Sequence, residues 1–170
     1  PAFLDLQSTV QDGEAAQATI ERLQERCPER GLHWLRAIQL SKLERHEEAS
    51  QAILAALQHA EPLGEPFNIY QMVRVALLPE TIDTVIEIVQ TTPYHFYSQA
   101  QRALTLGVGL CDKELAPEQA RKFLLEAHPH MPDNPMIAQR LAKLSEEPEE
   151  HERYAREALR LAPGWTYARS

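Results

Sequence analysis

The chain has 170 residues with 25 acidic and 17 basic side chains, a formal net charge of −8. This acidic balance argues against nucleic acid as a partner, because binding to phosphates requires a basic surface. No stretch approaches the roughly 20 apolar residues that cross a bilayer, so we expect no direct membrane insertion of this segment. The two cysteines, Cys27 and Cys111, lie far apart, which favours separate thiols over a disulfide framework or a metal site.

The predicted elements are all helices. In chain order they cover 13–27, 31–45, 47–60, 66–78, 80–91, 94–111, 117–128, 134–145 and 149–161. We call those at 31–45, 66–78, 94–111 and 134–145 first helices, and the others second helices. Several starts carry helix signals, namely Pro79 with Glu80, Pro117 with Glu118, and Asn134 with Pro135. The pattern predicts an all-α fold of about nine helices with short connections and no strand.

Five prolines divide the chain at similar intervals. They are Pro28, Pro62, Pro93, Pro132 and Pro163, separated by 34, 31, 39 and 31 residues. The residues five and eight positions before each proline are apolar in every case, and their offset of three places them on one helical face. These positions hold Leu23, Leu57, Ile88, Ala127 and Ala158, and Ile20, Leu54, Val85, Leu124 and Ala155. The residue twelve before is small in four of the five units, which lets a neighbouring helix approach closely.

The spacing and these residues resemble the tetratricopeptide repeat family, whose period is about 34 residues. Ala120, Leu124, Ala127 and Pro132 match the second half of the family pattern, and Leu106-Gly107 and Leu141-Ala142 look like its Leu-Gly pair. The second repeat fits two registers, one with Trp34 at the family's tryptophan and one through Ala49, Ile53 and Ala56. The unit at 66–92 lacks the Trp and the Leu-Gly. The resemblance covers roughly residues 13–168 and implies a right-handed α-solenoid of antiparallel helix pairs, a single domain over residues 1–170.

The ends of the sequence suggest a segment of a longer chain. It opens on a second helix and closes on Pro163-Gly164-Trp165-Thr166-Tyr167, which has the pattern of another first helix. For the compartment we favour the cytoplasm, with a periplasmic or extracytoplasmic part of a membrane protein as the alternative.

Catalytic and metal-binding patterns are missing from the sequence. It contains no Gly-rich phosphate loop, nucleophile elbow or H-E-x-x-H motif. His128 and His130 flank Pro129, but the further ligands that a metal needs do not cluster there. We therefore predict a binding module that is not an enzyme and has no cofactor and no metal.

Charge is divided between the two helix types. The first helices hold seven basic residues and one acidic residue, whereas the second helices hold fourteen acidic and seven basic residues. Cations late in a helix complement its dipole, and this explains part of the division. In the family, first helices line the concave groove, so the division also predicts a basic groove that attracts an acidic segment of a partner.

Aromatic, amide and basic side chains on the first helices are the candidate binding residues. Arg and aromatic side chains are enriched at binding hot spots. We predict a groove formed by Asn68, Gln71, Arg74, Tyr97, Gln101, Arg102, Arg140 and Lys143. The family's clamp for chaperone C-termini uses Lys and Asn, and its positions here hold residues such as Leu104 and Val108. The expected function is a non-catalytic scaffold for a protein or peptide. The alternative is a regulatory or substrate-presenting domain of a larger enzyme, such as a membrane-anchored transferase.

Overall fold

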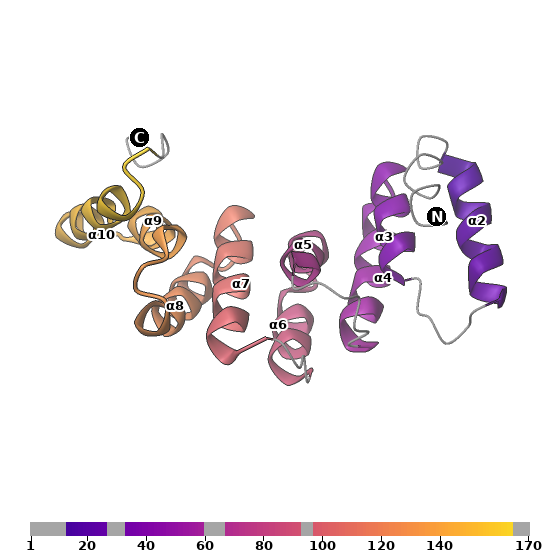
Figure 1. Cartoon of the computed structure of the whole chain (residues 1–170), viewed down its shortest axis with the longest axis horizontal. Coiled ribbons are helices and arrows are strands. Elements are labelled where there is room, and N and C mark those ends of the chain that lie inside the picture. The colour runs from indigo at the N-terminus through magenta and orange to yellow at the C-terminus, as the bar shows by residue number, and fades with distance from the viewer. Residues whose placement is uncertain (1–12, 27–32, 60–66, 93–96, 165–170) are drawn as a thin grey trace. The chain divides into compact units, whose positions relative to one another are not determined.

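A computed structural model describes residues 13–26, 33–59, 67–92 and 97–164 of the chain. These residues form α-helices and one short 3-10 helix, with no strand among them, which confirms the all-α class (Figure 1). The helices are α2 (Gly13–Arg26), α3 (His33–Lys42), α4 (His46–His59), α5 (Phe67–Ala76), α6 (Ile82–Thr91), α7 (Gln99–Asp112), α8 (Pro117–Ala127), η1 (His128–His130), α9 (Pro135–Leu144) and α10 (Pro148–Leu161). The first helices are thus α3, α5, α7 and α9. Each predicted helix overlaps one of these α-helices.

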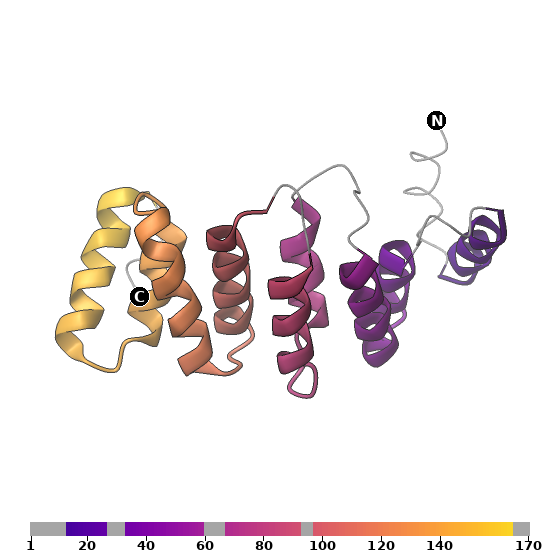
Figure 2. The ribbon, with the colours of Figure 1, turned by 90° about the horizontal axis from the view of Figure 1, so that it is seen from below.

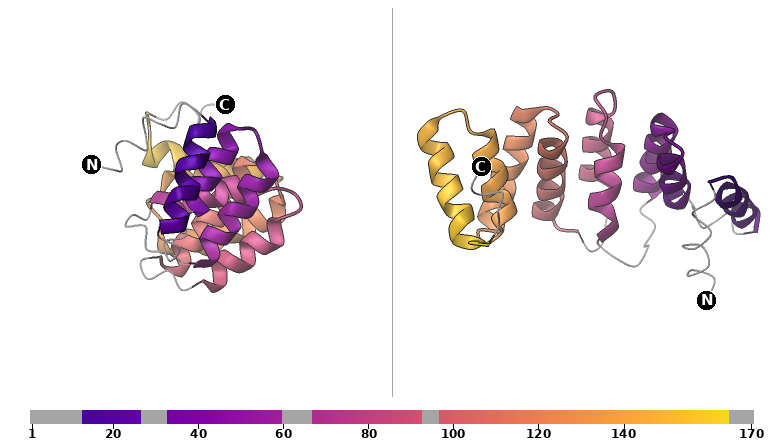
Figure 3. Two further views of the ribbon diagram at one scale, coloured as in Figure 1. Left: turned by 90° about the vertical axis from the view of Figure 1, so that its right-hand side faces the viewer. Right: turned by 90° about the horizontal axis from the view of Figure 1, so that it is seen from above.

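The chain divides into two compact units, Pro1–Tyr94 and His95–Ser170, and each is described by itself. In the first unit, α3 packs against α2 and α4, and α4 also contacts α5 and α6. Figure 3 shows α3 and α4 lying side by side. Ser50 of α4 is buried and donates a hydrogen bond to the Ala76 carbonyl at the end of α5, at 3.1 Å. Its small side chain therefore brings the two helices together, as the repeat pattern predicts.

In the second unit, α7 contacts both α8 and α9, and α9 also contacts α8 and α10. Figure 2 shows α9 and α10 side by side as an antiparallel pair joined by a short connection. Gly107 of α7 faces α8 so closely that a β-carbon there would lie 2.7 Å from Leu124 Cγ and 3.1 Å from the Ala120 carbonyl oxygen. The Leu-Gly pair and the small residue of the repeat pattern therefore meet at one helix crossing.

The apolar positions of the repeat form the core. Of the ten residues five and eight before the prolines, Ile20, Leu57, Val85, Ile88, Leu124, Ala127 and Ala158 are buried, and the other three are half-buried. In α4, residues of both possible registers of the second repeat are buried. Ser50 and Leu57 belong to the register counted from Pro62, and Ala49 and Ile53 belong to the alternative. That helix packs on α3 on one side and on α5 and α6 on the other, so its buried face is wide.

Local signals explain the starts of α8, α9 and α10. The Asn134 side chain accepts a hydrogen bond from Met136 N at 3.0 Å, and Pro135 starts α9. Pro117 and Pro148 start α8 and α10, each followed by glutamate in the first turn. The prediction of a helix start at Glu80 is wrong, because Pro79 and Glu80 lie in a turn and α6 begins at Ile82.

Two helices miss a predicted bound by three residues or more. The helix predicted to reach residue 45 ends at Lys42, since Glu44 adopts a left-handed φ of 57°. The helix predicted to begin at residue 94 begins at Gln99 after the Ser98 cap, while residues 93–96 lie outside the described residues. Cys27, Trp165 and Tyr167 also lie outside them, as does the Trp34 side chain.

Candidate partner-binding surface

Three predicted binding residues hold the start of α7 together. The Tyr97 hydroxyl and the buried Thr105 hydroxyl are hydrogen-bonded at 2.8 Å. Gln101 completes a capping box, since its Oε1 accepts from Ser98 N at 2.8 Å while Ser98 Oγ accepts from Gln101 N at 3.2 Å. Arg102 Nε donates to the Tyr97 carbonyl oxygen at 3.3 Å. Polar groups of all three residues therefore make local contacts that define this end of the helix.

Burial changes the acid strength of Tyr97. Its half-buried side chain disfavours the phenolate, so burial raises the pKa of the Tyr97 hydroxyl above its usual range, and the hydrogen bond with Thr105 opposes this in part. Tyr97 therefore enters any contact with a partner as a neutral phenol at physiological pH.

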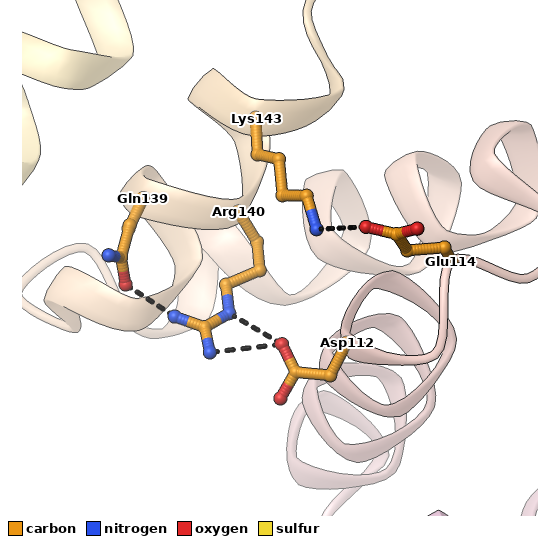
Figure 4. A network of polar contacts seen from close by, with 5 residues as sticks. All are labelled: Asp112, Glu114, Gln139, Arg140 and Lys143. Carbon is orange, nitrogen blue, oxygen red and sulfur yellow. Dashed lines mark hydrogen bonds and ion pairs between the residues drawn. The ribbon is translucent and has the colours of Figure 1, made fainter. Parts of the chain in front are cut away.

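The other two predicted residues of the second unit lie in a polar network between α7 and α9 (Figure 4). Arg140 Nε and Nη2 donate to Asp112 Oδ1 at 3.2 and 3.0 Å, and its Nη1 donates to Gln139 Oε1. Lys143 Nζ lies 3.2 Å from Glu114 Oε1. We call these five residues the α7–α9 polar cluster. It joins the C-terminal end of one first helix to the middle and end of the next.

Burial separates the two ion pairs of the α7–α9 polar cluster. The Arg140 and Asp112 side chains are 22% and 23% exposed, whereas those of Lys143 and Glu114 are 54% and 79% exposed. An exposed pair contributes only about 0–1 kcal/mol, because water competes for both partners. A partner can therefore break the ion pair between Lys143 and Glu114 and bind either charge at little cost in free energy. Arg140 and Asp112 form the more rigid part of the cluster.

Arg74 is the predicted residue of the first unit whose side chain is described. Its guanidinium carbon lies 5.7 Å from the centroid of the Tyr70 ring, one helical turn earlier in α5. Among the described residues, Arg74 Nε is the one buried side-chain polar atom without a hydrogen-bond partner. A buried donor left unpaired costs about 1–3 kcal/mol. Asn68 and Gln71 belong to the same helix, but their side chains lie outside the described residues.

The second helices of the second unit are joined by a separate set of contacts. Arg121 Nη2 of α8 donates to both carboxylate oxygens of Glu150 in α10, at 2.7 and 2.9 Å. This hydrogen bond keeps the pKa of Glu150 below its usual range. His128 Nε2 lies 3.1 Å from Glu157 Oε1, and its ring meets Tyr154 edge-on at a centroid distance of 6.0 Å. These contacts fasten α10 to α8 and to η1.

In the described part of the chain, other reactive groups do not converge into a site. Cys111 is buried, and burial raises the pKa of its thiol. No group of three or more His, Cys, Asp or Glu side chains in the described part of the chain is placed to hold a metal ion. A depression of about 470 Å³ lies between the start of α7 and the end of α8, lined by Ser98, Gln99, Ala100, Glu126, His130 and Met131. Its lining includes one carboxylate, of Glu126, and one imidazole, of His130.

No described helix is both long and apolar enough to span a membrane.

Sequence reasoning missed the acidic half of the α7–α9 polar cluster. Asp112 and Glu114 follow the predicted helix 94–111, so a charge count over that helix does not include them. Within the helix bounds of the structure, the first helices carry six basic residues and Asp112 as their one acidic residue. The division of charge remains, but Arg140 and Lys143 are paired with carboxylates, which weakens the positive field expected from them.

Comparisons with protein-family models, with curated proteins and with solved structures gave no match for this chain.

Proposed function

We propose that this chain is a tetratricopeptide-like helical-repeat module, wound as a right-handed solenoid, that binds an extended or helical segment of another protein on its first helices. The observation that carries the proposal is that the first helices α7 and α9 contact each other as well as their own second helices. In the second unit α7 and α9 therefore form one continuous face, and a linear segment needs such a face rather than a closed pocket.

The α7–α9 polar cluster gives this face groups that a segment can use. Lys143 and Glu114 stand largely in solvent and form an ion pair with each other, so a bound chain can exchange partners with either of them. Arg140, fixed by Asp112 and Gln139, keeps its position while this exchange occurs. A fixed residue loses less conformational entropy on binding than a free one, which favours affinity.

The second helices supply a contrast within the same unit. Arg121 on α8 is bonded to both oxygens of Glu150 and serves the contact between α8 and α10. Lys122, the next residue of α8, is exposed. We therefore assign binding to the first helices and use second-helix residues as controls.

A selection from a random peptide library on the immobilised full chain tests the proposal. We expect enriched peptides that bind saturably and slow amide hydrogen exchange in α7 and α9 more than in α8 and α10. Protection confined to α8 and α10 would contradict the assignment of the face. Failure to enrich any peptide over the bare support would count against a segment-binding module.

A further inference from the structure

Arg74 differs from the paired basic residues of the first helices in its surroundings. Arg140 and Lys143 have carboxylate partners, Asp112 and Glu114. Arg74 makes no ion pair among the described residues, and its contact there is with the face of the Tyr70 ring. A guanidinium with a buried Nε and no acceptor keeps an unused hydrogen-bonding edge.

The donors on that edge fit one kind of acceptor, a carboxylate. Nε and one Nη of a guanidinium form a planar fork, and a carboxylate accepts two parallel hydrogen bonds from it. The Tyr70 ring contributes a cation–π contact at 5.7 Å from the guanidinium carbon, and this contact uses none of the N–H groups. Arg74 is only half-buried as a residue, so its charge lies at the boundary between the core and solvent.

We propose that Arg74 is an anchor for a carboxylate of an acidic segment in the partner protein, seated side-on against the Nε–Nη edge. The assignment rests on the proposed function, and it names the chemistry that the first helix α5 recognises within the first unit. Seating the carboxylate requires the Arg74 side chain to rotate so that Nε faces the ligand. The rotation gives the buried donor an acceptor, and Tyr70 continues to support the guanidinium face.

The net charge of the chain means that an acidic peptide needs a local cation to bind. A chain with net charge −8 repels an acidic peptide at long range. Attraction must therefore come from a local group that is not neutralised by its own chain. The sulfate or phosphate of a small anion offers similar oxygens, so the experiment must separate an acidic segment from a free anion.

Two-dimensional NMR of the arginine Nε–Hε groups in the full chain tests the anchor. The probes are N-acetylated octaglutamate, octaglutamine of the same length, and inorganic phosphate. The Arg74 signal is assigned by its loss in Arg74→Lys, which keeps the charge and removes the fork. Arg22→Lys is the matched control, since Arg22 is exposed on the second helix α2 of the same unit.

We expect octaglutamate to shift the Arg74 Nε–Hε signal downfield and saturably, and octaglutamine to leave it unchanged. Arg74→Lys should weaken octaglutamate binding about tenfold or more, because one point charge replaces a bidentate contact, while Arg22→Lys binds like the parent. Phosphate that shifts the signal as effectively as octaglutamate would identify a small-anion site and overturn the assignment.

Two further outcomes separate this inference from the proposed function. Octaglutamate that binds without moving the Arg74 signal, and equally well to Arg74→Lys, overturns the anchor and leaves the segment-binding face intact. Octaglutamate that does not bind at millimolar concentration also overturns the anchor. The library selection then decides independently whether the chain binds any other segment.

Discussion

Gly107 of α7 and Leu124 of α8 are in such close contact that a β-carbon at residue 107 would lie 2.7 Å from Leu124 Cγ. The Ala120 carbonyl, a backbone group that cannot turn away, stands 3.1 Å from the same point. Glycine is therefore required here for the approach of two helices. This crossing sets the distance between a first helix and its second helix in the best-matched repeat.

Gly107→Ala should lower the free energy of unfolding of the second unit. Overpacking a core contact costs about 1–3 kcal/mol, which exceeds the roughly 1 kcal/mol that alanine gains over glycine in a helix. In a Leu124→Ala background the main clash is gone, so the same change should become neutral or stabilising. Urea unfolding of the four chains of this double-mutant cycle measures the reversal, and additive effects would mean that the two helices are further apart.

Leu124→Ala alone should destabilise the chain by about 2–5 kcal/mol, as truncation of a buried leucine generally does. Leu124 is fully buried, and α7 and α8 are already in close contact at Gly107, so the helices have little room to close on a cavity. Denaturant unfolding followed by circular dichroism gives the value. A loss below about 1 kcal/mol would show that this face of α8 is not core.

The two ion pairs of the α7–α9 polar cluster should have different energies. A double-mutant cycle on Arg140→Gln and Asp112→Asn should give a coupling of about 1 kcal/mol, because these side chains are mostly shielded and share two hydrogen bonds. The matched cycle on Lys143→Gln and Glu114→Gln should give less than about 0.5 kcal/mol. Equal couplings would contradict the division into a rigid and an exchangeable part.

Tyr97 should titrate above the usual tyrosine pKa of about 10. The difference between the absorbance titrations of the parent and Tyr97→Phe isolates this hydroxyl. Thr105→Val should raise the pKa of Tyr97 further, since the Thr105 hydrogen bond lowers it. Because the folded pKa exceeds the unfolded pKa, the contribution of Tyr97 to stability is complete below pH 10 and is lost as the pH rises through the folded pKa. A titration midpoint of the Tyr97 hydroxyl at or below about pH 10 would mean that this side chain is exposed to solvent.

Periodic features of the sequence predicted the helices well. Residues five and eight before each proline are buried or half-buried because three-residue spacing and a terminating proline are properties of a single helix. The Ser98 to Gln101 spacing is a capping-box signature. Reading it would have moved the start of α7 from residue 94 to Gln99 and shown that Gln101 has a local role.

The candidate surface was less predictable, since it depends on pairs of residues far apart in sequence. Arg140 meets Asp112 across 28 positions, and no local pattern links the two. The unpaired Nε of Arg74 follows from packing around α5, which a helical wheel does not contain. Composition could predict that first helices are basic, but not which of their cations are already neutralised.

The central claim is that a partner segment lies on the first helices, and site-specific photo-crosslinking tests it most directly. A benzophenone amino acid replaces Lys143 on α9 or, as the matched control, Lys122 on α8, which are both exposed lysines of the second unit. A peptide selected on the full chain should crosslink to position 143 and not to position 122. Crosslinking at position 122 with none at position 143 would contradict the account.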